Sequence, residues 1–236
     1  MKNLKVQYSF KHGVIDGLPI VIGFLPIGMA FGILSKTTGI TMLDSILFSV
    51  LVFAGASQFI ALNLLMVGAG IGEIILTTSL VNFRHFLMGA SLATRMTEDM
   101  KRWSPFIAFG ITDEVFSIAS FKDGTLTKEY MISLELMGYS AWVFSTALGY
   151  FVGGILPIAV KSSMGIALYA MFGAILIPEI KKSNKAAILA GLSGVINTIC
   201  KYFFALPQGW SIVISIIIAS FLGLYLFKEG EMEEYE

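Results

Sequence analysis

Cysteine, histidine and charged residues are scarce in this sequence of 236 residues, and each shortage excludes a class of protein. The one cysteine, Cys200, lies in an apolar stretch, so neither an internal disulfide nor a cysteine-based metal cluster is expected. The two histidines cannot assemble a histidine-rich metal site. Charged residues make up 14% of the chain and sum to zero net charge, which argues against a nucleic-acid partner.

The short motifs of common enzymes are also missing. The sequence contains no Walker-type phosphate loop, no His-Glu-x-x-His metal motif and no Gly-x-Ser-x-Gly nucleophile elbow. We therefore expect neither an enzyme nor a bound cofactor or metal. Without a nucleotide-binding segment, the chain is not expected to hydrolyse ATP by itself.

Hydrophobic residues dominate instead, at 56% of the chain and a mean hydropathy of +0.81. A membrane span needs about 20 apolar residues, and about eight stretches of that kind are present. They cover 16–34, 45–68, 74–93, 103–121, 130–156, 162–178, 186–205 and 209–227. The sequence predicts an all-α integral membrane protein, a polytopic helical bundle of about 7–8 transmembrane segments with broken or re-entrant helices. Residues 1–236 form a single transmembrane domain in this interpretation, with a basic N-terminal segment (1–13) and an acidic tail (228–236).

The basic residues raise a problem of topology. They gather in the N-terminal segment, in 95–102 and in 181–185, and the positive-inside rule would place all three clusters in the cytoplasm. Three apolar stretches separate each cluster from the next, and an odd number of full spans cannot return to the same side. Either one stretch in each group is re-entrant or broken, or one cluster violates the rule.

Two stretches contain candidate helix breaks. The second has small and polar residues at its middle, Gly55, Ala56 and Ser57, and the first carries Pro19 and Pro26. Proline removes a backbone donor and glycine weakens a helix, so either stretch can unwind, the second being the stronger candidate. Close helix packing is the alternative role for such small residues.

Five residues of the third and fourth stretches are the main candidates for a substrate or ion pathway: Asn82, Arg84, His85, Asp113 and Glu114. A charge at the centre of a spanning helix costs roughly 2.5–3.5 kcal/mol, so these groups are expected to face one another or water. Arg84 lies eleven residues before Arg95 and Asp113 eleven after Arg102, which is about 16 Å of helix in each case. In an antiparallel hairpin, Arg84 and a carboxylate would therefore meet at the same depth.

Two interpretations of this cluster stay open. The charges either bind a charged substrate or relay protons, or they form a structural ion pair that locks the hairpin. Intramembrane ionisable residues favour the first interpretation. Gln58 is a further candidate for polar contact with a substrate, with hydrogen bonding between helices as its alternative, and Glu135 is expected to reach water near a helix end.

Several motifs together resemble the AzlC family of branched-chain amino acid exporters. They are Phe53-Ala54-Gly55-Ala56-Ser57-Gln58-Phe59, Asn82-Phe83-Arg84-His85 and Thr112-Asp113-Glu114-x-Phe116. The resemblance implies the large subunit of a two-component exporter in a bacterial inner (cell) membrane, with a small hydrophobic partner of the AzlD type. It also implies export of leucine, isoleucine, valine and in some cases methionine, driven by an ion or proton gradient.

Two other classes remain as alternatives to an exporter. One is a channel-like or structural membrane subunit in which the ion pair only orders the bundle. The other is the permease of an ATP-driven transporter whose ATPase is a separate chain. Uncoupler-sensitive efflux would separate an exporter from a channel.

Overall fold

The computed structural model describes residues 8–122, 125–155, 183–206 and 208–227, with isolated positions between 173 and 181. Within this part the regular elements are α-helices, apart from one isolated β-bridge between Met96 and Leu126. The all-helical prediction is therefore confirmed for the described residues. The acidic tail 228–236 and most of the predicted span 162–178 lie outside them.

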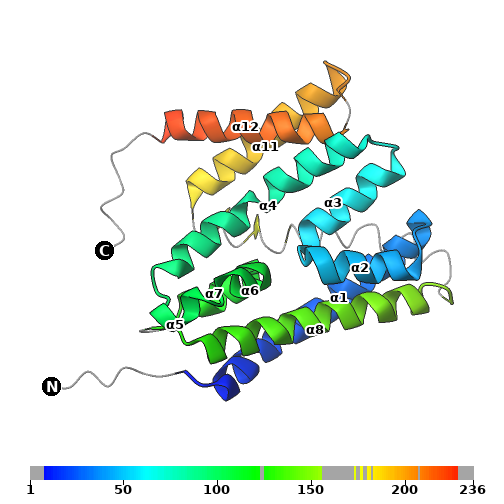
Figure 1. Cartoon of the computed structure of the whole chain (residues 1–236). Coiled ribbons are helices and arrows are strands. Elements are labelled where there is room, and N and C mark those ends of the chain that lie inside the picture. Colours follow the sequence, from blue (N-terminus) through cyan, green and yellow to red (C-terminus); the bar gives the residue numbers. More distant parts are fainter. Residues whose placement is uncertain are drawn as a thin grey trace. The chain divides into compact units, whose positions relative to one another are not determined.

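The helices are arranged in two compact units, Met1–Leu62 with Val81–Leu168 and Asn63–Leu80 with Tyr169–Glu236. The second unit contains the packed pair α11 and α12. The first unit holds the predicted site. In chain order the helices are α1 (Phe10–Thr38), α2 (Met42–Val52), α3 (Gly55–Met66), α4 (Ile71–Ala93), α5 (Glu98–Lys101), α6 (Ser104–Gly110), α7 (Asp113–Ser120), α8 (Lys128–Val152), α11 (Asn184–Tyr202) and α12 (Gln208–Leu226) (Figure 1).

Helices α1 and α8 lie side by side and run in the same direction (Figure 1). Near the start of α1, Gly13 lies against Tyr130, and near its end Gly32 lies against Thr146. The glycines bring the two backbones so close that a Cβ on Gly32 would lie 2.1 Å from the Thr146 carbonyl oxygen. Small residues at such a crossing allow the close van der Waals packing that joins helices in lipid.

Helix α1 is continuous through Pro19 and Pro26, so the break predicted as one possibility for the first stretch is wrong. Proline leaves one backbone carbonyl of the preceding turn without its donor, but a helix tolerates this when neighbours support it. The long contact with α8 supplies that support. It holds α1 helical over 29 residues.

The second predicted stretch is not one span but a helical hairpin, α2 and α3. Ser49 and Gln58 are nine residues apart, about 13 Å along a straight helix, yet Gln58 Nε2 donates to Ser49 Oγ at 3.1 Å. The chain therefore reverses at Phe53 and Ala54. Phe53 ends α2 in the left-handed region, with φ 43° and ψ 44°, which is strained for a bulky side chain.

The fourth predicted stretch is also divided. Helix α6 ends at Gly110 and α7 begins at Asp113, so the prediction of one span over 103–121 is wrong. Arg95 lies before α6 in the chain. Its guanidinium donates to the carbonyls of Ala119 and Ser120, near the end of α7, at 3.1 and 3.0 Å. Because the end of α7 returns to the chain that enters α6, these helices form a second hairpin.

These reversals bring the start of α1 and the second basic cluster close together. The Thr127 hydroxyl donates to the carbonyl of Tyr8, and Lys122 Nζ lies 2.7 Å from Asp16 Oδ2. Arg95 contacts the backbone of Lys122 as well. The start of α1 and the second cluster therefore lie at the same end of the first unit, and the side of a membrane that this end faces stays a prediction.

Among the described helices, α1 has both the length and the apolar composition needed to cross a membrane. Helices α4 and α8 have 23 and 25 residues, which is long enough, but their sequences are less apolar than that of α1. The all-helical architecture is established for the described part. The number of spans, 7–8, stays a prediction.

Candidate functional site

The ion pair that the spacing predicted is present between α4 and the start of α7. Arg84 Nη1 lies 2.7 Å from Asp113 Oδ2, and the two side chains are 33% and 32% exposed. Asp113 is the first residue of α7, which Thr112 caps by accepting a hydrogen bond from the Val115 N–H. A carboxylate at this position is favoured by the helix dipole, and it is also open enough to meet a ligand.

The other members of this charged cluster (Asn82, Arg84, His85, Asp113 and Glu114) lie around the pair. His85 is half-buried, and its Nδ1 lies 3.2 Å from the Asn82 carbonyl oxygen of its own helix. Glu114 is half-buried next to Asp113, about 100° further around α7. The structure thus brings the five predicted residues to one place. Of the two carboxylates, Asp113 faces Arg84, which agrees with the expectation that at most one of them can do so.

Two polar atoms of this cluster lack a partner in the part of the chain that the structure describes. Asn82 Oδ1 and Arg84 Nε are buried and form no hydrogen bond there. Buried polar groups are normally satisfied, and an exception calls for a water or ligand. One acceptor and one donor are therefore available beside the ion pair.

A cavity of about 290 Å³ lies between α4 and α6, next to His85. Its lining is otherwise small or apolar, which leaves His85 as its one titratable side chain. A Cβ on Gly89 would meet Ile111 at 3.8 Å, an ordinary contact. The lining residues are His85, Phe86, Gly89, Ala90, Ala93, Met96, Ser104, Ala108 and Ile111.

At the other hairpin, the break lies slightly before the predicted position. The turn falls on Phe53 and Ala54, whereas Gly55, Ala56 and Ser57 form the first turn of α3. A Cβ on Gly55 would lie 2.8 Å from the ring of Trp142, and the Ser57 hydroxyl donates to the Ala54 carbonyl at 2.9 Å. The small residues therefore allow the turn to pack against α8.

Gln58 holds this hairpin together. Its Oε1 accepts from the Ala54 N–H at 3.2 Å and from Trp142 Nε1 at 3.0 Å, while its Nε2 donates to Ser49. The side chain is fully buried, and Ser49 continues the network to the Thr146 hydroxyl at 2.8 Å. These partners lie outside the charged cluster, so the geometry favours the alternative of hydrogen bonding between helices.

Replacing Gln58 by Leu should destabilise the protein by about 2–6 kcal/mol. Two buried donors, the Ala54 N–H and Trp142 Nε1, would lose their acceptor, at about 1–3 kcal/mol each. Thermal unfolding in detergent measures the effect. A Gln58→Glu variant, whose acid form keeps the acceptor and a donor, should recover most of the loss, and wild-type stability of the Leu variant would contradict the role.

The tips of the two hairpins meet on α8. The ring centroids of Phe53 and Phe109 lie 6.2 Å apart, and the ring of Tyr139 lies 5.1 Å from the first and 6.0 Å from the second. The Tyr139 hydroxyl donates to the Val50 carbonyl at 3.0 Å. Two interruptions of the helical backbone therefore share one aromatic contact in the first unit.

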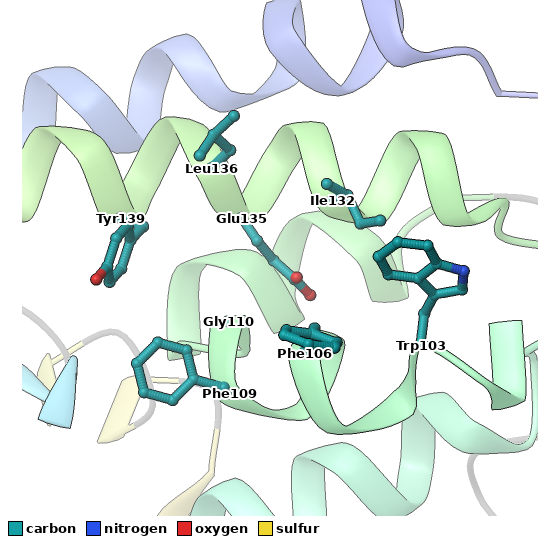
Figure 2. A pocket seen from close by; sticks show the side chains of 8 residues that line it. All are labelled: Trp103, Phe106, Phe109, Gly110, Ile132, Glu135, Leu136 and Tyr139. Carbon is teal, nitrogen blue, oxygen red and sulfur yellow. The ribbon is translucent and has the colours of Figure 1, made fainter. Parts of the chain in front are cut away.

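Glu135 differs from its prediction. It is 6% exposed, about 10 Å along α8 from Lys128, and does not reach water as expected of a residue at a helix end. Figure 2 shows its side chain extending from α8 toward α6 in a pocket rimmed by aromatic rings. A lone carboxylate in an otherwise apolar stretch was the signal in the sequence, but its burial depends on the position of α6.

Comparisons with known proteins identify the family of the chain. A family model described as "AzlC protein" matches residues 19–156. The chain is 33% identical over 207 residues to "Inner membrane protein YgaZ" of Escherichia coli, with 84% of each chain covered. It is 27% identical over 187 residues to "Branched-chain amino acid transport protein AzlC" of Bacillus subtilis, covering 78% of this chain and 73% of that protein. No solved structure matches. The chain is a membrane protein that belongs to the AzlC family.

Proposed function

We propose that the chain is the membrane subunit of a secondary transporter that exports branched-chain amino acids, driven by an ion or proton gradient. The observation that carries this proposal is the ion pair between Arg84 and Asp113, set at a helical interruption in the first unit. The name of the Bacillus subtilis relative, a branched-chain amino acid transport protein, supports the substrate class. The proposal includes a small hydrophobic partner of the AzlD type and a bacterial inner membrane.

The charged cluster has the groups that a zwitterionic amino acid requires. Arg84 would hold the substrate carboxylate, and Asp113 or Glu114 its ammonium group, so the substrate would replace the internal ion pair. Asn82 Oδ1 and Arg84 Nε provide two further polar contacts. An apolar surrounding would select an aliphatic side chain, with weak discrimination among leucine, isoleucine, valine and methionine.

The two helical hairpins fit a transport cycle. Unwound backbone at membrane depth is tolerated where protein or a water-filled cavity surrounds it, and discontinuous helices form the substrate sites of many secondary transporters. Here the break at Phe53 lies close to the break at Ile111–Thr112, because the ring of Phe53 contacts that of Phe109 at the end of α6. Movement of one tip past the other would alternately expose the Arg84–Asp113 pair.

The charge distribution supports a cytoplasmic N-terminus. The start of α1, with Lys11, and the second basic cluster lie at the same end of the first unit, since Lys122 pairs with Asp16 and Arg95 donates to the Lys122 carbonyl. The positive-inside rule assigns that end to the cytoplasm. Export would therefore begin from this end.

Efflux from cells tests the proposal. The chain, co-expressed with its small partner in cells loaded with leucine-containing dipeptides, should increase leucine release above that of cells with either subunit alone. A protonophore should abolish the concentrative part of this release. Release that runs only down the leucine concentration gradient would indicate a channel. Release that stops when ATP is depleted, although the proton gradient is intact, would indicate an ATP-driven permease.

A further inference from the structure

A second cavity in the first unit surrounds one carboxylate, apart from the charged cluster. It has a volume of about 240 Å³, and Figure 2 shows Glu135 extending into it from α8. The other lining side chains are apolar, apart from the Tyr139 hydroxyl and the indole N–H of Trp103. The lining residues are Trp103, Phe106, Phe109, Gly110, Ile132, Glu135, Leu136 and Tyr139.

Glu135 has no compensating partner among the described residues. Its Oε1 is buried without a hydrogen bond, and no basic side chain of the described part forms an ion pair with it. Its carboxyl group lies against Gly110, where a Cβ would come within 2.5 Å of Oε2. The absence of a side chain at Gly110 is what lets the carboxyl group reach the end of α6.

The charged groups on the helices packed against α8 form no ion pair with Glu135 in the described part of the chain. On α7, Asp113 pairs with Arg84, and on α1, Asp16 pairs with Lys122 and accepts from the Tyr130 hydroxyl at 2.9 Å. The remaining ones are the exposed Lys11 on α1, Lys36 on α1, which lies over the ring of Tyr150, Asp44 on α2, which accepts from Thr41, and Glu114 on α7. None of the described cations forms an ion pair with Glu135.

The Tyr139 hydroxyl does not balance it either, because it donates to the Val50 carbonyl. Water and backbone dipoles stabilise a carboxylate only where they reach it, and an apolar pocket favours its neutral acid form. The charge state of Glu135 therefore depends on how far water enters this cavity. Trp103 and Phe106, two of its lining residues, are 41% and 70% exposed.

We infer that Glu135 is the binding site of the coupling proton. The carboxylate takes one proton from water when the cavity is open to one side of the membrane. It stays a neutral acid while access to the cavity changes, and it returns the proton to water on the other side. Its position beside Gly110, three residues before Asp113, connects this step to the α6–α7 tip that holds the ion pair. The inference rests on the proposed transport function.

Sodium or another metal ion fits the cavity less well than a proton. Hard cations require several oxygen ligands, and the lining offers one carboxyl group and one committed hydroxyl. The described residues contain no group of three or more metal-ligating side chains. A proton requires one oxygen atom, which Oε1 provides.

Transport by membrane vesicles that contain the chain and its partner tests the inference. Wild-type vesicles should accumulate leucine when a pH gradient is imposed, and should exchange external for internal leucine without a gradient. The Glu135→Gln variant should lose gradient-driven accumulation, with a much smaller effect on exchange, because exchange requires no net proton movement. Equal loss of both activities, retained accumulation, or accumulation driven by a sodium gradient in the wild type would overturn the inference.

Failure of the proposed function would give a different result, because wild-type vesicles would then show neither exchange nor accumulation. Infrared spectroscopy adds a measurement independent of transport. The carboxylic acid C=O band of the purified wild type should lose one component in Glu135→Gln, and an unchanged band would show that Glu135 is ionised and overturn the inference.

A pair of glycine variants tests the position of the carboxyl group. Gly110→Ala should displace the Glu135 side chain and impair gradient-driven accumulation more than exchange, since its Cβ would collide with a flexible carboxyl group rather than with backbone. Gly23→Ala is the matched control, because a Cβ on Gly23 meets no atom within 4 Å. Equal coupling in the two variants would contradict the proposed position of the proton site.

Discussion

Alanine in place of Arg84 is expected to lower leucine efflux by about 10- to 100-fold while the protein remains in the membrane. Hydrogen bonds to charged groups contribute about 1.5–3 kcal/mol, and alanine removes those that Arg84 would form with a substrate carboxylate. Asp113→Asn should have an effect of similar size, because it removes the charge that faces the ammonium group. Initial rates of release from dipeptide-loaded cells, divided by the amount of protein in the membrane, measure both effects.

A charge exchange separates binding from a structural lock. The double variant Arg84→Asp with Asp113→Arg keeps two opposite charges at the same two positions but exchanges them. In the wild type, Arg84 Nη1 lies 2.7 Å from Asp113 Oδ2. Recovery of efflux would mean that the pair only orders the helices, whereas continued loss supports contact with the substrate. Lys128→Ala is the control, since Lys128 and Glu129 form an exposed pair at 3.6 Å that should contribute little. Wild-type efflux from Arg84→Ala would contradict the site itself.

The matched depth of Arg84 and Asp113 could be predicted from counting because both distances run along helices from one short connection. The count placed Asp113 beside Arg84 although the element that contains it was predicted wrongly. An apolar run such as 103–121 does not distinguish a continuous span from two half-helices. The local signal for a new helix was Thr112 followed by Asp113 and Glu114, a capping residue before an acidic first turn.

Other features depend on contacts that no local pattern contains. Pro19 and Pro26 predicted a possible break, but the packing of α1 on α8, more than a hundred residues away in the sequence, keeps that helix intact. Gln58 looked equally suited to a substrate or to another helix, and the position of Trp142 decides between them. The burial of Glu135 likewise follows from where α6 ends, which only the folded chain determines.

The close contact of α1 with α8 gives the second large expected effect. Gly32 faces backbone, because its Cβ would lie 2.1 Å from the Thr146 carbonyl oxygen and 2.6 Å from the Tyr150 nitrogen. Backbone atoms cannot rotate away as a side chain can, so the two helices would have to separate. This separation would extend to Ser49, which bonds to the Thr146 hydroxyl and so connects α8 to the α2–α3 hairpin.

Gly32→Ala should therefore cost about 3 kcal/mol, the upper part of the range for overpacked cores. This corresponds to a Tm roughly 6–12 °C lower in detergent. Gly23 on the same helix is the matched control, because a Cβ there meets no atom within 4 Å. Gly23→Ala should leave the Tm unchanged or raise it, since alanine favours helix over glycine by about 1 kcal/mol. Equal Tm values for the two variants would show that α1 and α8 are packed less closely than in this structure. The contact with α8 would then not explain why α1 stays helical at its two prolines.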